Sequence, residues 1–460
     1  MRVTEERVLK DSQRASAGAV KGDPRALLEN IGNSVNDSRS KLPISDSERV
    51  KTARRKAWEL RSVLWRESNI RAVQSCGRVA ITESGEVQPI ATGSDVAFYG
   101  VATCKSIWVC PCCSARIQSR RRRELGLLFG KALETGSAAF GAYTLRHSRS
   151  DSLADLQDAL SGCWRRVSMD PKLKRLRKRL GWIGLVKGVE HTFTLANGWH
   201  PHLHPVHIFD RVLTAEEVAN YHAVEFAIWK RAAEKFGLQS PMERAQQLHI
   251  VEISNSKTVL DLADYVAKGN LMARSSGSVA WEMTGTNTKT YSRTSDSGSL
   301  TPFDILEKIS MSITPQQKSK WLGIWHEYER VTRGRSALTY SKGLREHFGL
   351  RGLVKDESEL IKELEVVPDT DFGFVLTDYV PIGKNHHLGS GLLNAITPKG
   401  NYEAGRDFCR KHKLDFIDLL SRNKTLDYGN SRDVSVSKFV ASAVIKVQLI
   451  KSEWDQVSFD

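Results

Sequence analysis

Four histidines fall within residues 197–207, which read NGWHPHLHPVH. Three of them, His200, His202 and His204, occupy alternate positions, and alternate side chains of an extended chain point to the same face. Imidazole is a common ligand of divalent metal ions, and two imidazoles one residue apart on a strand can reach a single ion. The segment therefore predicts a metal site on a β-strand. His207 is out of phase with this row, and we expect it to have a structural role.

A third ligand depends on the register of the hairpin that the Asn-Gly pair in this segment predicts. If residues 196–198 form a three-residue loop, His204 lies opposite Glu190, which then shares the histidine face. If the Asn-Gly pair alone forms the turn, His191 lies opposite His204 instead. The two registers exclude each other because a slip of one residue moves every side chain to the other face. We prefer Glu190, because a carboxylate suits Mg²⁺ or Mn²⁺. A polar sheet face without metal is the alternative.

A tyrosine further along the chain could act as a nucleophile. In DLADYVAKG, residues 261–269, helical spacing puts Asp261, Tyr265 and Lys268 on one face. A free tyrosine has a pKa of about 10, but a nearby ammonium group and a metal-bound phosphate both favour the phenolate. Such a tyrosine could attack a phosphodiester and retain the 5′ phosphate while the metal polarises the non-bridging oxygens. The alternative is an amphipathic helix whose tyrosine packs and whose lysine is solvated.

Five of the seven cysteines lie between positions 76 and 113, which indicates a metal site in a reducing compartment more than a disulfide scaffold. Cys110 and Cys113 form a C-x-x-C pair, and Cys76 and Cys104 could complete four thiolates around a structural Zn²⁺. Cys112 could compete as a ligand. The alternative is a reduced, partly buried cluster without metal.

The chain is basic, with 68 Lys and Arg against 53 Asp and Glu and a formal net charge of +15. Such a balance favours a polyanionic partner such as nucleic acid. A cationic helix start follows the cysteines, and its arginines could contact phosphates. A solvated run of charge is the alternative. The candidate DNA-contacting residues are Arg116, Arg120, Arg121, Arg122 and Arg123.

The elements around the histidine row follow the order βαββαβ, that of a ferredoxin-like split unit. This order predicts an α+β fold in which helices back an antiparallel sheet. The expected elements are strand 137–147, helix 151–170, strands 181–195 and 198–209, helix 214–237 and strand 247–254, with a further helix at 257–268 beside the sheet.

The flanking regions divide the chain further. Helical spacing predicts basic helices over 46–75 and 114–136, helices within 303–350, and helical patterns at 402–420 and 434–450, with a Gly-rich loop at 383–400. The expected division is 1–45 flexible leader, 46–136 basic helix and cysteine-rich element, 137–300 nicking domain, 301–354 helical extension, and 355–460 C-terminal segment of unknown role. The chain shows neither a secretory signal nor a stretch of membrane-spanning length, so we expect a cytoplasmic protein without a membrane partner.

Several of these motifs, in this order, resemble the rolling-circle plasmid replication initiators of the HUH endonuclease superfamily, in the branch with a cysteine-rich N-terminal part. The resemblance rests on CGRVAI, CKSIWVCPCCSARIQSRRRREL, YTLRH, the His-hydrophobic-His motif GWHPHLH and the Tyr-x-x-Lys motif ADYVAKG. WEMTGTNTKTYSRTSDSGSLTPFDIL and WHEYERVTRGRSALTYSKGLREHFGL, further along, also look like this branch. The resemblance covers about residues 50 to 350 and draws its specificity from the order and spacing of the motifs.

The resemblance implies roles for individual residues. The metal ligands of the family fall on His202 and His204, with Glu190 as the third, its nucleophile on Tyr265 and its helper lysine on Lys268. It implies Mg²⁺ or Mn²⁺, a nick at a hairpin-presented origin, a 5′-phosphotyrosine link, and a free 3′ hydroxyl that primes synthesis. It also implies a host helicase and polymerase as partners.

The chain departs from the pattern of the family at two positions. Asp261 stands where some members use a glutamate to activate water for the closing step, which puts that role in doubt. Pro205 follows the last histidine in place of an aliphatic residue, so we expect the strand to bend or to lie at an edge there.

The sequence thus predicts an initiator that nicks and rejoins one DNA strand. A relaxase or transposase of the same superfamily would share the chemistry. A zinc-containing DNA-binding regulator without nuclease activity is the alternative from another class, and in such a protein the histidine row and Tyr265 would be dispensable.

Overall fold

The histidine segment lies in a five-stranded antiparallel sheet of the computed structural model, which describes residues 46–91, 96–251, 299–350, 373–398 and 400–419. Its strands are β6, β3, β5, β4 and β7 in spatial order. The first four of these are the expected strands, and numbered by their order along the chain they lie in the sheet as 4-1-3-2. The bounds are β3 Ser137–Thr144, β4 Trp182–Thr194, β5 Gly198–Phe209, β6 Gln247–Val251 and β7 Leu338–Tyr340. The expected strands and the mixed α+β character are confirmed. β7 falls in a stretch expected to be helical, and its three residues are too few to show a period of two.

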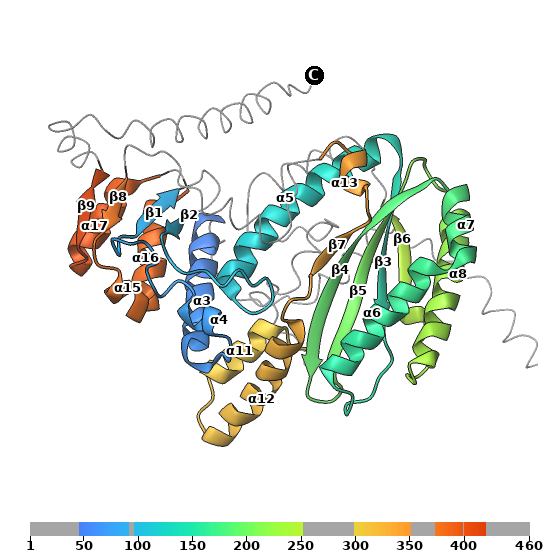
Figure 1. Ribbon diagram of the computed structural model, residues 1–460, viewed down its shortest axis with the longest axis horizontal. Helices are drawn as coiled ribbons and strands as arrows, with labels where there is room; N and C mark the ends of the chain where they lie inside the picture. Colours follow the sequence, from blue (N-terminus) through green and yellow to red (C-terminus); the bar gives the residue numbers. More distant parts are fainter. Residues whose placement is uncertain (1–45, 92–95, 252–298, 351–372, 399, 420–460) are drawn as a thin grey trace, which may run out of the picture.

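Three helices cover one face of this sheet (Figure 1). They are α6 (Leu153–Met169), α7 (Pro171–Arg179) and α8 (Ala215–Lys235), and a 3₁₀ turn, Glu243–Ala245, precedes β6. Each helix begins at a side chain that accepts hydrogen bonds from its first turn, namely Ser152, Asp170 and Thr214. The apolar stripe of α6 is buried, as its spacing predicts, and packs in one core with Trp199 and Leu203 of β5.

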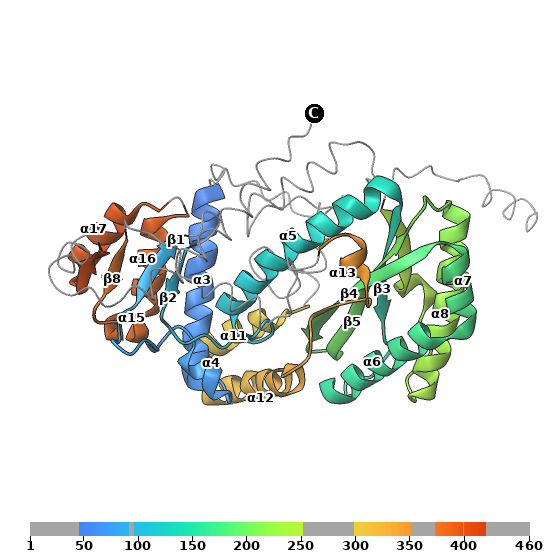
Figure 2. The same cartoon turned by 45° about the horizontal axis from the view of Figure 1, so that its top comes forward.

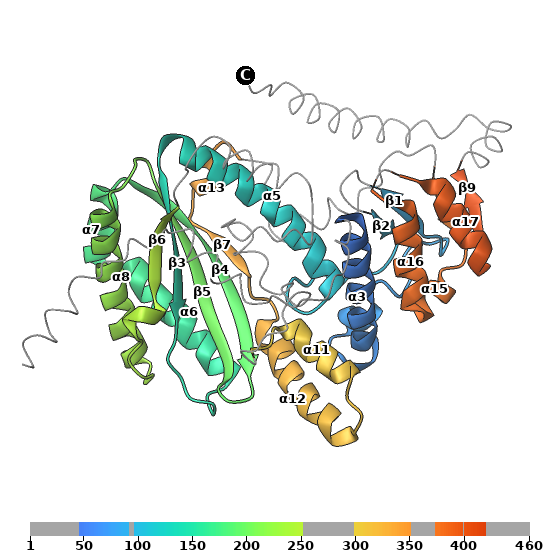
Figure 3. The ribbon, with the colours of Figure 1, turned by 180° about the vertical axis from the view of Figure 1, so that it is seen from behind.

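The opposite face is covered in part by α5 (Pro111–Thr135), which extends from the sheet to the N-terminal helices (Figure 3). Leu125, Leu128 and Phe129 of α5 pack with Val206 of β5 in a second core. Even-numbered residues of β5 therefore face α5, whereas odd-numbered residues face α6 and α8. The face of each histidine follows from this alternation.

A second body of structure combines segments from both ends of the chain. It contains α3 (Asp46–Glu67), α4 (Arg71–Ser75), the hairpin β1 (Gln88–Ala91) and β2 (Val96–Tyr99), and the C-terminal elements. Trp58 of α3, Phe98 of β2, Phe374 and Leu392 share one buried cluster. The C-terminal elements are β8 (Phe374–Leu376), α15 (Val380–Lys384), α16 (His386–Ile396), α17 (Tyr402–His412) and β9 (Phe416–Asp418).

The prediction of a Gly-rich loop at 383–400 is wrong, because α15 and α16 occupy most of this stretch. The glycines that favoured a loop in the sequence instead allow α16 to pack closely against neighbouring aromatic rings. A Cβ on Gly389 would lie 2.2 Å from the Trp58 ring, and one on Gly391 would lie 2.7 Å from the Phe408 ring. The helix expected over 402–420 ends at His412 and gives way to β9.

Helices α11 (Pro302–Ser310) and α12 (Pro315–Thr332) join these two bodies, and the short α13 (Leu344–His347) follows β7. Figure 2 shows α12 between α4 and α6. Glu327 of α12 accepts hydrogen bonds from the Leu153 amide (2.8 Å) and from the Trp199 indole (3.0 Å), while Glu329 accepts one from the Asn69 amide (2.9 Å). Two carboxylates on different sides of α12, two residues apart, thus fix the cysteine-rich part against the sheet. No helix in the described ranges is long and apolar enough to span a membrane.

Candidate metal sites and DNA-contacting surfaces

The β4–β5 hairpin sets the arrangement of the histidine row, and its register differs from both expected ones. Glu190 pairs with His202, and Gly188 pairs with His204. The turn spans residues 195–197, ahead of Gly198 with a φ of 75°. Compared with the preferred register, the pairing is shifted by two residues. A shift of two keeps every side chain on its expected face, because the side chains of a strand alternate with a period of two.

Glu190 therefore lies on the same face as the histidine row. The Nε2 atoms of His202 and His204 lie 2.8 and 3.0 Å from the same Oε2 of Glu190. One ligand atom from each of the three residues lies within 4.8 Å of the others, and Glu190 and His204 are buried. The Phe140 ring stacks on the His204 ring at 5.8 Å between centroids, which fixes its orientation. We call these three residues the sheet triad.

His200 extends the row without joining the sheet triad. Its Nδ1 lies 3.0 Å from Nε2 of His147, the histidine at the end of the YTLRH segment. Burial, together with the neighbouring imidazoles of His202 and His147, lowers the pKa of His200 to about 4. A neutral imidazole remains able to hydrogen bond or to bind a metal ion.

His191, the alternative third ligand, lies on the opposite face. Its Nε2 lies 2.7 Å from Oε1 of Gln157 in α6, and its ring packs edge-on against Trp108 and Tyr328. Burial lowers its pKa to about 3. Trp108 is only 4% exposed, so it packs in the core, where it is not available to stack on a base. His191 is therefore a core residue, remote from the face that carries the triad.

The cysteine cluster brings together four sulfur atoms from Cys76, Cys104, Cys110 and Cys113. Cys76 Sγ lies 3.7 Å from Cys110 Sγ and 3.6 Å from Cys113 Sγ, and Cys104 Sγ lies 3.7 Å from Cys113 Sγ. A tetrahedral Zn²⁺ with Zn–S bonds of about 2.3 Å separates its sulfurs by about 3.8 Å. The cluster is thus compatible with a structural zinc. Cys112 does not belong to this set of four.

Local elements position these thiols. Cys76 ends α4, and its carbonyl accepts a hydrogen bond from the Trp65 indole (3.0 Å). Cys110 is the N-cap of α5, and Cys113 lies in the first turn of that helix. Hydrogen bonds from the thiols of Cys104, Cys110 and Cys113 hold the pKa of Cys76 well below its usual range. One thiolate is therefore favoured in this cluster even before a cation is considered.

The candidate nucleophile and its neighbours are not described by the structure. Asp261, Tyr265, Lys268 and the helix expected at 257–268 lie outside the described residues, so their roles stay predictions.

The arginines of α5 do not all reach its surface. Arg121 is 3% exposed and pairs with Glu124 at 2.8 Å, so we withdraw it from the DNA-contacting set. Arg116 and Arg120 are partly exposed, and the side chains of Arg122 and Arg123 lie outside what the structure describes. The run of arginines therefore combines a buried ion pair with partly exposed cations.

A second cationic surface lies on α7 and was missed in the sequence analysis. The helix reads PKLKRLRKR and has no acidic residue. An amphipathic pattern in the sequence could have identified this surface. Leu173 and Leu176 are buried, while every lysine and all but one arginine of the helix are exposed. The exception, Arg177, is buried and pairs with Glu225. The exposed set, here called the α7 basic face, comprises Lys172, Lys174, Arg175, Lys178 and Arg179.

Comparison with known proteins places the chain near two curated proteins. It is 26% identical over 339 residues to "Protein rep" of Streptomyces lividans, an alignment that covers 62% of this chain and 72% of that protein. It is also 31% identical over 143 residues to "Neomycin resistance protein" of Streptomyces cyanogenus, with 25% of this chain and about a third (32%) of that protein covered. No family model and no solved structure matches. The chain is therefore distantly similar to a Streptomyces Rep protein over most of its length.

Proposed function

We propose that this chain initiates rolling-circle plasmid replication by nicking and rejoining one DNA strand. The observation that carries the proposal is the sheet triad, in which Glu190, His202 and His204 converge on one face of a sheet. The βαββαβ order and its spatial order of strands support a ferredoxin-like HUH core. The similarity to "Protein rep" supports a role in replication.

The donor set of the sheet triad suits a divalent cation. Two imidazoles and one carboxylate leave further coordination positions open for substrate, as catalytic metal sites do. The mixture of nitrogen and oxygen donors favours Mn²⁺, and Mg²⁺ is the alternative. When bound, the ion would polarise the non-bridging oxygens of a phosphodiester. The strand backbone positions both imidazoles and Phe140 stacks on that of His204, so binding would require little rearrangement.

Tyr265 would supply the nucleophile. Its phenolate oxygen forms a bond to phosphorus while the bond from phosphorus to the 3′ oxygen breaks, and the departing 3′ oxygen takes up a proton. The 5′ phosphate stays on the tyrosine, and attack by a 3′ hydroxyl reverses the step and rejoins the strand. Lys268, one turn further along the expected helix, would stabilise the phenolate. Asp261 would be the candidate base for the closing step.

The other parts of the chain would hold DNA and the fold. A structural zinc on the four cysteines would fix the start of α5 and thereby Arg116 and Arg120. These arginines and the α7 basic face would contact phosphates without reading sequence. The free 3′ end left by the nick would be extended by a host polymerase, behind a host helicase.

The test is a covalent adduct. The protein is incubated with supercoiled plasmid, and in parallel with single-stranded oligonucleotides that tile the candidate origin, in the presence of Mn²⁺. We expect a protein–DNA adduct that survives denaturation, disappears with Tyr265→Phe and weakens more with Glu190→Ala than with the matched control His191→Ala. Binding without any adduct across the candidate origins would reject the proposal.

Two alternatives predict different results in the same assays. A relaxase or transposase would form the adduct through Tyr265 but act on transfer-origin or element-end oligonucleotides in preference to a replication origin. A zinc-containing DNA-binding regulator would bind DNA equally well with or without Tyr265 and the sheet triad. The convergence of three potential ligands on one face of the sheet favours the enzyme over the regulator.

A further inference from the structure

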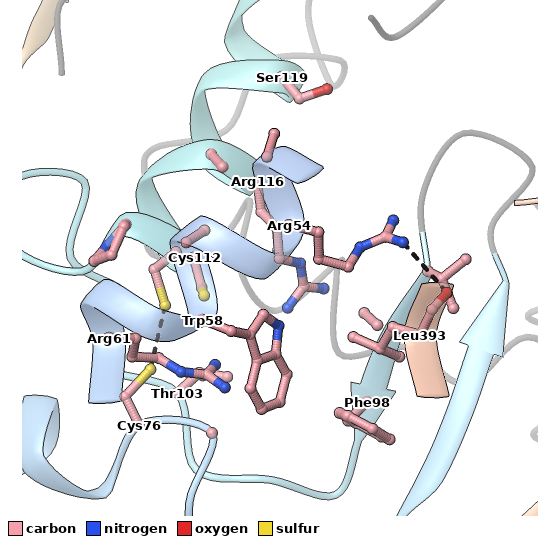
Figure 4. Close-up of a pocket in the computed structure, with 18 of the residues that line it drawn as sticks. Arg54, Trp58, Arg61, Cys76, Phe98, Thr103, Cys112, Arg116, Ser119 and Leu393 are labelled. Atoms are coloured by element: carbon pink, nitrogen blue, oxygen red, sulfur yellow. Dashed lines mark hydrogen bonds between the residues drawn. The ribbon is translucent and has the colours of Figure 1, made fainter. Parts of the chain in front are cut away.

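A cavity of about 130 Å³ lies where α3, the first turns of α5 and β2 meet. By the measure in which one water occupies about 10 to 15 Å³, it has room for about ten waters. Figure 4 shows side chains from all three elements around it. No aspartate or glutamate occurs among the described residues that line it. The lining residues that matter here are Arg54, Trp58, Arg61, Phe98, Arg116 and Ser119.

Arg61 is the residue around which this cavity is built. It is only 5% exposed, and its Nε and Nη2 have no hydrogen-bond partner among the described residues. Its guanidinium stacks on the Trp58 ring, with Cζ 3.6 Å from the ring centroid. Stacking engages the face of the guanidinium, so the in-plane N–H groups still need acceptors. A buried cation with unused donors is the expected binding group for an anion.

The backbone is shaped to admit this guanidinium. Gly77 has a φ of 63°, and a Cβ there would lie 2.1 Å from Nη1 of Arg61. Any other residue at position 77 would therefore displace the arginine. A buried charge of this kind is costly to keep, which favours a role beyond packing.

The neighbouring cysteines do not supply the missing acceptors. Although burial opposes it, the negative charge of Cys112, Cys76 and Cys110 in their thiolate forms raises the pKa of Arg61. Charge attraction of this kind acts at a distance. Nε and Nη2 still donate to no sulfur within the described residues. The donors are thus left for a ligand in the cavity.

The rest of the wall indicates what kind of anion fits. Phe98 and Leu393 give the cavity an apolar side. Arg116 adds positive charge, while Arg54 holds the Leu393 carbonyl and the Asn394 side chain, at 3.2 and 2.8 Å. A small inorganic anion would leave the apolar wall unused. A nucleotide has both a phosphate for the guanidinium and a sugar or base for the apolar wall.

We propose that this cavity binds one nucleotide of a DNA strand, with its phosphate on Arg61 and its apolar part against Phe98 and Leu393. The inference rests on the proposed function for the identity of the strand as DNA. It adds a nucleotide-binding site beside the cysteine cluster, on the N-terminal part of the chain, separate from the sheet triad. A strand nicked at the triad would thus have a second, non-catalytic point of attachment.

The test measures binding of a fluorescent single-stranded oligonucleotide by the full chain with its metal content intact. Arg61→Met should weaken binding at least about tenfold, since charge-assisted hydrogen bonds are lost. The matched control is Arg55→Met, which removes the same charge from an exposed position on α3 paired with Glu48. It should change affinity less than about twofold, because an exposed pair contributes little. Equal weakening by both variants would contradict the proposal.

A second variant protects the test against a role of Arg61 in the cysteine cluster. Ser119→Leu leaves Arg61 in place and narrows the cavity, so it should also weaken binding while the zinc content stays unchanged. If Ser119→Leu binds like the wild type, the proposal is wrong, whatever Arg61→Met does to zinc.

Further arms identify the source of the phosphate and separate this inference from the function. Deoxyadenosine monophosphate and inorganic phosphate should compete with the oligonucleotide only weakly, and tighter binding of the free mononucleotide would overturn the assignment to a strand. Adduct formation through Tyr265 with no effect of Arg61→Met would reject this site and keep the initiator. Binding that depends on Arg61 without any adduct would keep this site and reject the initiator.

Discussion

On each side of the central sheet a glutamate lies close to a histidine of β5, Glu190 from β4 and Glu225 from α8, yet the two arrangements differ in what surrounds the carboxylate. On the face that α5 covers in part, Glu190 meets His202 and His204. On the face under α6 and α8, Glu225 lies 3.3 Å from His207 and 3.3 Å from Arg177, and it accepts a hydrogen bond from Tyr143 (2.7 Å). The side chain of Glu225 is fully buried, whereas that of His202 in the sheet triad is 13% exposed.

The difference shows that a histidine beside a carboxylate does not by itself make a metal site. Glu225 has a guanidinium and a phenol as permanent partners, so its oxygens are already engaged. Glu190 and its histidines could exchange their mutual contacts for a cation. The Glu225 arrangement, with His207, Arg177 and Tyr143, is a network suited to stability, here called the closed network. The sheet triad around Glu190 is a cluster suited to binding. Each can be tested without disturbing the other.

The largest expected effect is the loss of stability when the closed network is broken. Glu225→Gln leaves Arg177 buried without a charged partner and should lower the free energy of unfolding by about 3 to 5 kcal/mol. Urea unfolding followed by circular dichroism measures it. Glu48→Gln, which removes an exposed partner of Arg55, should cost less than about 1 kcal/mol. A Glu225→Gln variant as stable as Glu48→Gln would show that the network is not structural.

The second effect is a loss of cleavage without a comparable loss of stability. Glu190→Gln keeps the size of the side chain but removes the charge that a divalent ion requires. We expect cleavage to fall at least about 100-fold, in keeping with the several kcal/mol that a metal ion contributes to catalysis.

Metal binding provides a readout of the triad that is independent of cleavage. Mn²⁺ should raise the melting temperature of the wild type and leave that of Glu190→Gln unchanged, because a ligand stabilises only the fold that binds it. His191→Gln, on the opposite face, should keep the Mn²⁺ response. A Glu190→Gln variant that still responds to Mn²⁺ would remove Glu190 from the proposed ligands.

The third effect is a dependence of stability on acid pH to which the closed network should contribute. Although burial works in the opposite direction, His207 and Arg177 lower the pKa of Glu225 to about 2, from 4.5. A group with a depressed pKa in the folded state stabilises the fold above its unfolded pKa, and this contribution is lost as the pH falls through the folded value. Unfolding free energies should thus decline between pH 4.5 and 2, and less steeply in Glu225→Gln. Parallel curves for the two proteins would contradict this assignment.

The smallest effect concerns the outer side of the closed network. Arg177 points inward from α7, while the α7 basic face points to solvent. The triple variant Lys172→Ser, Arg175→Ser and Arg179→Ser should weaken DNA binding about tenfold at moderate salt and flatten the slope of log affinity against log salt by about 2 to 3. Cleavage at saturating DNA should be unchanged, since none of the three lies in the sheet triad. An unchanged salt slope would place the DNA elsewhere.

Local pattern predicted much of the scaffold because it depends on short-range physics. Alternation along 197–207 predicted which histidines share a face, and helical spacing predicted the buried stripe of α6. Register was a different matter. A turn can be closed by several loops of similar energy, so the Asn-Gly pair indicated a hairpin without fixing which residues lie opposite. Glu190 reached the expected face in spite of a register error, because the error was an even number of residues.

Burial and long-range packing could not be deduced in the same way. Arg121 belongs to a run of arginines that looks uniform in the sequence, and only the position of α5 against the rest of the fold buries it beside Glu124. The glycines of α16 signal a loop unless Trp58 and Phe408 are known to press against them. Arg61 shows no special pattern in its helix, and its unused donors become visible only when α3, α5 and β2 enclose it.

The sequence by itself determined the βαββαβ order of the core elements, the face of each histidine and the set of cysteines able to bind zinc, because period and spacing act along the chain. The tertiary structure alone decided which glutamate is available to a cation and which is engaged by permanent partners. It also decided which arginines reach solvent and where an anion could be held. Those properties depend on which elements exclude water from a side chain, and the elements that do so come from distant parts of the chain.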